Sequence, residues 1–194
     1  MLREKLKSTK IVLASGSPRR QQFFRDLDVD FEIRVREVGE VFPASLHGAQ
    51  IPEFLCRLKA DAFDDLASDE LLVTSDTIVW FQGEALNKPA NFEQAMEMLR
   101  KLQGQTHEVI TSVCFRDTRK TDVISDSTMV SFNPLPDEAL RYYLEHYRPY
   151  DKAGSYGIQD WIGLVGVARI EGSYANVMGL PVDKVFQYLN SYKP

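Results

Sequence analysis

The chain has 194 residues and a formal net charge of −5, with 44% hydrophobic and 26% charged residues. That composition is ordinary for one globular domain, residues 1–194, and no apolar run approaches the roughly 18 residues of a membrane span. The negative charge argues against a broad nucleic-acid surface, because neutralising phosphates requires a basic face. We therefore expect neither a membrane nor a nucleic acid as a partner.

The cysteine content favours a reducing compartment. Cys56 and Cys114 are too few for a disulfide framework and have no metal-ligand spacing. The basic N-terminal stretch is followed by no secretory apolar segment with a cleavage site. We expect two buried reduced thiols and a cytoplasmic protein.

Strands and helices alternate along the chain, as their apolar spacing indicates. Asn91 and Gln94 have the spacing of a capping box at a helix start. Interleaved strands and helices predict an α/β fold, and the neighbouring strands within 107–133 predict a mixed sheet. In chain order the expected elements are a strand at 10–14, a helix at 19–27, a strand at 29–35, a loop at 36–50, a helix at 52–67, a strand at 71–81, a helix from Asn91 to Gly104, strands near 107–116 and 122–133, a helix at 137–147, a glycine-rich segment at 151–166, a strand near 165–170 and a helix at 181–192.

The first candidate site is the sequence ASGSPRR at residues 14–20. Ser17 suits an N-cap and Pro18 a first helical residue, so free backbone N–H groups and the helix dipole would favour an anion there. Arg19 and Arg20 add donors for phosphate. The alternative is an ordinary capped helix with solvated arginines. A Walker loop is excluded because GK[ST] is absent.

The second candidate is Asp76, a carboxylate inside the apolar strand LLVTSDTIVWF. Such a group is costly unless it is paired, hydrogen-bonded or bound to a metal. Asp76 is expected to bind Mg²⁺ or orient a water, with a structural ion pair as the alternative. Either Glu37 or Glu40 would complete a hard-cation site.

The third candidate is the segment DKAGSYGIQ at residues 151–159, where small residues permit close approach to a ligand. Lys152 offers a phosphate contact and Gln159 an amide that reads a base, whereas a tight structural turn is the alternative. Lys88 lies in a loop before a capped helix. His107 is expected to support the fold, since the three histidines share no metal-ligand spacing.

Taken together, the motifs LASGSPRR, SDTIV, NKP, LRKLQGQTHEVITSV, DKAGSYGIQ and RIEGSYANVMGLPV resemble the Maf family of nucleotide pyrophosphatases, in order and over nearly the whole chain. The resemblance implies a mixed twisted sheet with flanking helices, in two lobes around a cleft, similar to inosine triphosphate pyrophosphatases. It also implies hydrolysis of a nucleoside triphosphate between the α- and β-phosphates with a divalent cation, Mg²⁺ or Mn²⁺, and frequently a homodimer.

The resemblance carries roles to individual residues. Asp76 takes the catalytic position, with Glu40 as its partner in metal binding. Arg19, Thr77 and Gln159 match the positions that mark the dTTP/UTP branch. The full set of expected substrate-binding residues is Ser15, Arg19, Arg20, Lys59, Thr77, Lys88 and Gln159.

One segment departs from the family pattern. The family's helix motif RLAxxKA, compared with RLKADAF here, puts Ala62 at the lysine position. Lys59 lies three residues earlier on nearly the same helical face, so it is expected to serve in its place.

The expected function is therefore hydrolysis of dTTP, UTP and modified pyrimidine nucleotides to monophosphate and pyrophosphate. A 7-methyl-GTP pyrophosphatase is one alternative. The other is a non-catalytic regulator of cell division or septum formation, which would not need SPRR, Asp76 and Lys88 together.

Overall fold

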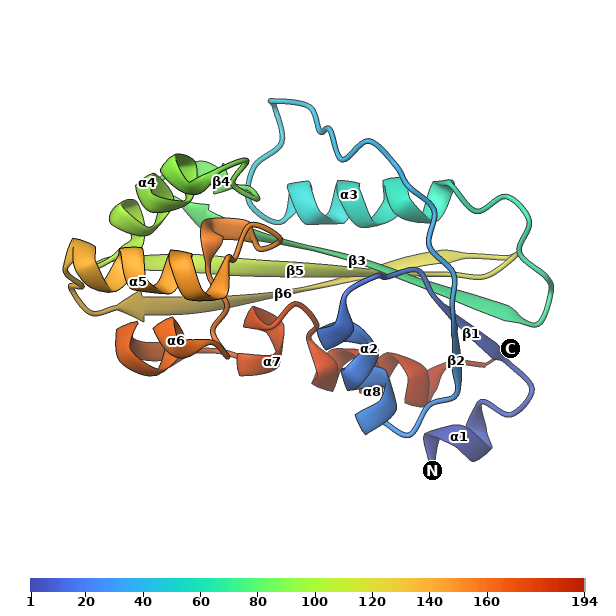
Figure 1. The fold of residues 1–194 in the computed structure, drawn as a ribbon. Helices are drawn as coiled ribbons and strands as arrows, with labels where there is room; N and C mark the ends of the chain where they lie inside the picture. The colour runs from blue at the N-terminus through green and yellow to red at the C-terminus, as the bar shows by residue number, and fades with distance from the viewer. Residues whose placement is uncertain (194) are drawn as a thin grey trace. The chain divides into compact units, whose positions relative to one another are not determined.

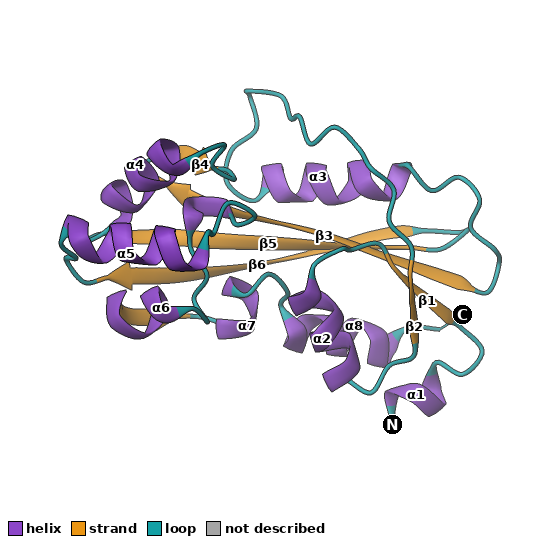
Figure 2. Cartoon of the chain, in the orientation of Figure 1, coloured by secondary structure: helices purple, strands orange, loops and turns teal. Residues whose placement is uncertain are grey.

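The computed structural model describes residues 1–193 and contains a seven-stranded mixed sheet of strand order β2-β1-β3-β5-β6-β7, with β4 beside β3 (Figure 1). β1 pairs in parallel with β2 and β3, whereas β4 pairs antiparallel with β3 and β7 with β6. This confirms the predicted mixed α/β class (Figure 2). The elements are α1 (Leu2–Lys5), β1 (Lys10–Leu13), α2 (Pro18–Asp26), β2 (Phe31–Ile33), α3 (Gln50–Asp61), β3 (Glu70–Phe81), β4 (Glu84–Leu86), α4 (Phe92–Leu102), β5 (Thr106–Arg116), β6 (Thr121–Phe132), α5 (Asp137–Tyr147), the 3₁₀ turn η1 (Ala153–Ser155), α6 (Trp161–Gly166), β7 (Val167–Glu171), α7 (Tyr174–Val177) and α8 (Val182–Ser191).

The chain divides into two compact units. Unit 1 comprises residues 1–76, 111–126 and those from 179 on, and unit 2 comprises residues 77–110 and 127–178. Within the described residues 1–193, no helix is long and apolar enough to cross a membrane. The assignment of the whole chain to one domain stays a prediction.

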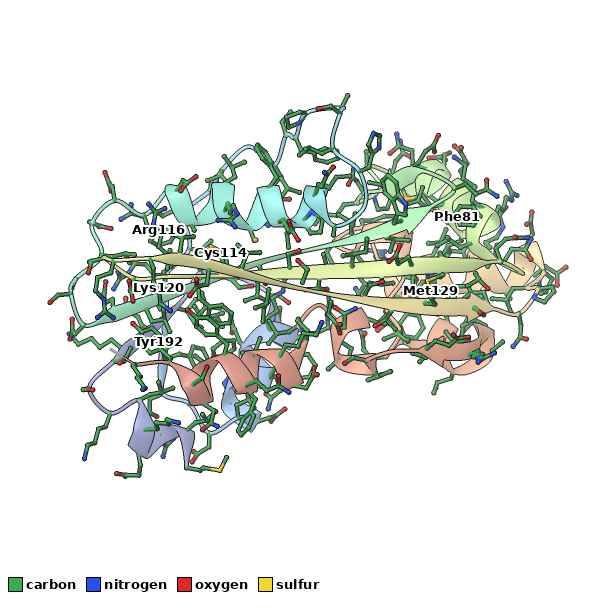
Figure 3. All side chains as sticks on the ribbon, turned by 180° about the vertical axis from the view of Figure 1, so that it is seen from behind. Phe81, Cys114, Arg116, Lys120, Met129 and Tyr192 are labelled. Atoms are coloured by element: carbon green, nitrogen blue, oxygen red, sulfur yellow. The ribbon has the colours of Figure 1, made fainter. Side chains whose placement is uncertain are left out.

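The core of unit 1 follows from the alternation of side chains along its strands. In β1, Val12 packs with Cys56 and Ala60 of α3, whereas its neighbours Ile11 and Leu13 pack into a different cluster. Figure 1 shows α3 on one face of these strands and α2 and α8 on the other. Both faces are thus covered, which explains why the strands are almost continuously apolar. The labelled Tyr192 lies beyond α8, toward Lys120 of the β5–β6 turn (Figure 3), with the Lys120 ammonium 5.8 Å from its ring centre.

The core of unit 2 is a single apolar cluster that includes buried side chains of α4 and α5. His107 is 1% exposed inside it, and its Nε2 lies 2.7 Å from the Tyr156 hydroxyl. Its ring also packs edge-on against Phe132. Burial lowers the pKa of His107 to about 4, so the ring is neutral near pH 7. The prediction that His107 supports the fold is confirmed.

The predicted helix caps are present. The Ser17 side chain accepts from the backbone N–H of Arg20, and Pro18 is the first residue of α2. Asn91 Oδ1 accepts from the Gln94 N–H at 2.9 Å, and Gln94 Oε1 accepts from the Ala90 N–H at 2.9 Å. These local hydrogen bonds fix where α2 and α4 begin.

Two element boundaries differ from prediction. α3 ends at Asp61 and not near residue 67, because the acidic residues that follow are unfavourable at a helix C-terminus. Arg36 instead binds the Ala62 carbonyl at 2.6 Å and pairs with Asp64 and Asp65. The expected strand at 29–35 is shortened to β2.

Five short elements were not expected, namely α1, β4, η1, α6 and α7. α6 occupies the second half of the segment that composition marks as glycine-rich. Elements of three to six residues contain too few apolar positions to show a helical or strand period.

Candidate active site

Three charged side chains meet in unit 1, and we call Glu40, Lys59 and Asp76 the charge cluster. The Lys59 ammonium lies 2.6 Å from Asp76 Oδ1 and 2.9 Å from Glu40 Oε1. The side chains of Lys59 and Asp76 are only 16% and 11% exposed, whereas that of Glu40 is 40% exposed. The ammonium therefore compensates a largely buried carboxylate, which explains how Asp76 is tolerated in the apolar strand β3.

The position of Lys59 is set by the packing of α3. Cys56 and Ala60 are wholly buried on the inner side of this helix, and Lys59 is one turn from Cys56. The Thr74 hydroxyl donates to the Cys56 carbonyl at 2.6 Å and joins α3 to β3 two residues before Asp76. The Lys59 side chain is thereby directed along the helix edge to Asp76.

Lys59, which is expected to serve in place of the family's lysine at position 62, lies beside Asp76. Ala62 is the C-cap of α3, and Lys59 itself contacts Asp76. Residues 55–60 read LCRLKA, which fits the LAxxKA part of the family pattern with Lys59 at the lysine, except that Cys56 replaces the alanine. An alignment on Leu55 in place of Arg57 would put Lys59 itself at the lysine position, and this alignment stays a prediction.

The SGSPRR segment lies at the start of α2, also in unit 1. Ser15 is buried, and its hydroxyl accepts from the Ser17 N–H at 3.2 Å. Arg20 donates through Nε to the Gly179 carbonyl at 2.8 Å and through Nη1 to the Ser75 carbonyl at 3.2 Å. Burial lowers the pKa of Arg20, although Asp76 acts in the opposite direction.

These contacts change the interpretation of the two arginines. Arg20 joins α2 to the residue that precedes Asp76, so its guanidinium serves at least in part to position β3. Arg19 is half-buried, as Arg20 is, and it stays a predicted phosphate ligand at the start of α2.

Unit 2 holds the other predicted binding residues. Thr77 is half-buried directly after Asp76 on β3, and Lys88 is exposed in the loop after β4. Gln159 is exposed, and its amide donates to Asp160 Oδ1 at 3.1 Å. The Gln159 side chain is therefore exposed to solvent, and its amide is held by the hydrogen bond to Asp160.

The segment that carries Gln159 is seated on β3 by a required glycine. Gly154 has a φ of +67°, and a Cβ there would lie 2.8 Å from Val79 Cγ2. Only glycine permits this backbone conformation and this close approach together. At Gly154 the close approach is to β3, in agreement with the structural-turn alternative, whereas the predicted approach to a ligand stays a prediction.

The carboxylates of the charge cluster can be compared with the ligands of known types of metal site. Within residues 1–193, no three His, Cys, Asp or Glu side chains are grouped as a metal site. Glu40 and Asp76 nevertheless share one cationic group, the Lys59 ammonium. Two carboxylates are the protein contribution typical of Mg²⁺ sites that are completed by water and substrate phosphates, so these residues fit that kind of site.

The structure also adds two polar residues that the sequence did not single out. Asp160 contacts Gln159, and the Tyr143 hydroxyl donates to Asp160 Oδ2 at 2.8 Å. Tyr143 is indistinguishable in sequence from an apolar core residue of α5. Asp160 directly follows Gln159, but adjacency alone does not predict a side-chain contact.

Comparisons with known proteins agree with these observations. The model of the family described as "Maf-like protein" matches residues 10–192. The chain is 60% identical to a "dTTP/UTP pyrophosphatase" of Flavobacterium psychrophilum over 97% of both chains, and 56% identical to one of Flavobacterium johnsoniae over 98% of this chain and 99% of the other.

Among solved structures, the Ham1 protein of Staphylococcus aureus matches with a TM-score of 0.49 and 14% identity, over 64% of this chain and 72% of that one. The family of the chain is shown by the match to the family model and by the sequence identity to the relatives, and the structural match is not needed for it. The chain belongs to the Maf family.

Proposed function

We propose that this protein hydrolyses dTTP and UTP, and modified pyrimidine nucleotides, to the monophosphate and pyrophosphate. The observation that carries the proposal is the charge cluster, in which a largely buried Asp76 is held by Lys59 at 2.6 Å. The names of relatives that match over nearly the full length support the same substrates.

In the proposed reaction the Asp76 carboxylate orients a water and accepts its proton as the oxygen attacks the α-phosphorus. The bond to the β-phosphate oxygen breaks, and pyrophosphate leaves. Lys59, Arg19 and Lys88 would offset the negative charge that develops on the phosphate oxygens. Ser15 would bind phosphate in the loop before α2, and Arg20 contributes by binding the Ser75 carbonyl next to Asp76.

We propose a divalent cation as the cofactor of this reaction. Glu40 and Asp76 would hold it, with the Lys59 ammonium moving aside onto the substrate phosphates. A bound Mg²⁺ or Mn²⁺ would supply polarisation of the triphosphate.

The choice of base is assigned to Arg19, Thr77 and Gln159. Uracil and thymine present two carbonyl acceptors and an N3–H donor, and a primary amide has groups of both kinds. A site that pairs with such an edge discriminates strongly, because the wrong base leaves polar groups without partners.

We also infer a cytoplasmic enzyme that forms a homodimer and does not bind nucleic acid. Both cysteines are free and buried, and the net charge is −5. Light scattering of the purified protein checks the dimer, since a monomer mass at micromolar concentration would contradict it.

A pyrophosphate-release panel tests the proposed function. The purified protein is assayed with Mg²⁺, Mn²⁺ or EDTA on dTTP, UTP, CTP, ATP, GTP and 7-methyl-GTP. We expect dTTP and UTP to be hydrolysed well ahead of the others, and EDTA to abolish turnover. A preference for 7-methyl-GTP would overturn the choice of base, and the absence of pyrophosphate release from every nucleotide would overturn the function.

A further inference from the structure

Four residues of unit 2 form a chain of hydrogen bonds that ends at Gln159, and we call Tyr143, Gly157, Gln159 and Asp160 the amide cluster. The Gly157 N–H donates to the Tyr143 hydroxyl at 3.0 Å, and that hydroxyl donates to Asp160 Oδ2 at 2.8 Å. The other carboxylate oxygen, Oδ1, accepts from Gln159 Nε2 at 3.1 Å. Asp160 therefore connects a buried tyrosine to an exposed amide.

The carboxylate decides which way the Gln159 amide faces. An ionised carboxylate only accepts hydrogen bonds, so the NH₂ group of Gln159 must face it and the carbonyl oxygen cannot. Because the amide is planar, Oε1 then points away from Asp160. The exposed end of Gln159 is thereby fixed as a hydrogen-bond acceptor.

The ends of the Gln159 and Asp160 side chains pack closely over the backbone of Gly157. A Cβ at the buried Gly157 would lie 2.5 Å from Asp160 Oδ2 and 2.6 Å from Gln159 Nε2. Both side chains thus rest directly on the glycine backbone. A larger residue at 157 would displace them together.

The Tyr143 hydroxyl stabilises the arrangement from the buried side. Tyr143 is 0% exposed. Burial, followed by the bond to Asp160, raises the pKa of Tyr143, so the hydroxyl keeps the proton that it donates. Asp160 Oδ2 accepts from the Tyr143 hydroxyl, and Asp160 Oδ1 accepts from the Gln159 amide.

We propose that Asp160 is a positioning residue that selects the base by holding Gln159 with Oε1 outward. In that orientation Gln159 accepts the N3–H of uracil or thymine and rejects cytosine, whose N3 is an acceptor. This inference rests on the proposed function to the extent that Gln159 contacts the base of the nucleotide.

Asp160→Asn tests the inference in the full-length protein. Asparagine can accept from the Gln159 NH₂ or donate to its Oε1, so the Gln159 amide can take both orientations. Asp137→Asn is the matched control, because it also removes one negative charge in unit 2, from an exposed pair with Arg100. We expect the ratio of kcat/KM for UTP over CTP to fall about tenfold in Asp160→Asn, mainly through KM, and to stay unchanged in Asp137→Asn.

A double variant separates positioning from a purely structural role. In Asp160→Asn with Gln159→Glu, residue 159 accepts in every orientation, so the preference for UTP over CTP should return even if overall turnover is low. A ratio in Asp160→Asn within twofold of the unmodified protein would overturn the inference. So would a double variant that does not recover the preference.

Product binding distinguishes this inference from the proposed function. UMP and CMP are titrated calorimetrically into the unmodified protein and Asp160→Asn without turnover. Tighter binding of UMP by the unmodified protein, lost in Asp160→Asn, supports the inference even if no triphosphate is hydrolysed. Equal affinity of UMP and CMP for the unmodified protein overturns it even if hydrolysis is confirmed.

Discussion

The charge cluster of unit 1 and the amide cluster of unit 2 each contain a carboxylate with little or partial exposure, and they use it in opposite ways. Asp76 is neutralised by the Lys59 ammonium at 2.6 Å, whereas Asp160 accepts from two neutral donors, Tyr143 at 2.8 Å and Gln159 at 3.1 Å. Paired opposite charges suit a site where phosphate charge and metal charge must be balanced. A carboxylate with neutral donors instead fixes the direction of a dipole, which suits the reading of a base.

The largest expected effect comes from removing the charge of Asp76. Asp76→Asn keeps the shape of the side chain but leaves a poor base and a weak cation ligand. We expect turnover of UTP to fall by about 10²- to 10⁴-fold, the range for loss of an acid–base group. Pyrophosphate release measures it, with circular dichroism as the control for folding. Near-normal turnover by a folded Asp76→Asn protein would remove the charge cluster from the mechanism.

The second prediction removes the cation that the two carboxylates share. Lys59→Ala leaves Asp76 largely buried without its ammonium, and truncating such a pair costs on the order of 2–5 kcal/mol. We expect both kcat/KM and the thermal midpoint to fall.

Two further variants sharpen that result. Lys101→Ala is the control, since its pair with Glu97 is exposed and worth about 0.3–0.5 kcal/mol. Adding Ala62→Lys to Lys59→Ala should restore nothing, because residue 62 lies at the C-cap of α3. Recovery of activity in that double variant would support the Ala62 alignment instead.

The third prediction tests whether the stability of unit 2 depends on the buried His107 ring staying neutral. The folded pKa of His107 is about 4, below the ordinary value of 6.5. The unfolded chain therefore binds more protons between pH 6.5 and 4, so the contribution of His107 is complete above pH 6.5 and is lost as the pH falls toward 4. The loss between pH 7 and pH 4 amounts to roughly 3 kcal/mol.

Urea unfolding between pH 4 and pH 7 measures this dependence. His107→Gln should flatten the pH dependence of the free energy of unfolding by about that amount. His146→Gln is the control, because His146 is exposed. If the pH dependence of the free energy of unfolding is unchanged in His107→Gln, burial of the His107 ring does not cause that dependence.

The smallest effect is expected for Arg20→Lys. Lysine keeps the charge but lacks the fork that reaches both the Gly179 and Ser75 carbonyls. We expect a loss of about 2 kcal/mol in the free energy of unfolding, because hydrogen bonds to these buried carbonyls are lost or weakened. Thermal unfolding checks this against Arg25→Lys on the exposed side of the same helix. A stable Arg20→Lys protein with reduced turnover would identify Arg20 as a phosphate ligand and not as a positioning residue.

Much of the fold follows from interactions between residues close in sequence. Ser17 caps α2 three residues before Arg20, and Asn91 caps α4 three residues before Gln94. The apolar strands near 10–14 and 71–81 are found where their composition predicts them. Hydrogen bonds within one turn and side-chain alternation are local, so the sequence alone contains the information for them.

The partners of the key polar groups were decided by the tertiary structure. Lys59 and Asp76 are 17 residues apart, as are Tyr143 and Asp160, and Arg20 binds a carbonyl 159 residues away. Motif and family resemblance predicted functional roles for Asp76 and Gln159, and helical spacing predicted one for Lys59, but neither predicted what holds these side chains. A polar side chain has several chemically equivalent partners in any sequence, and only the packing of helices onto strands determines which one lies within hydrogen-bond distance.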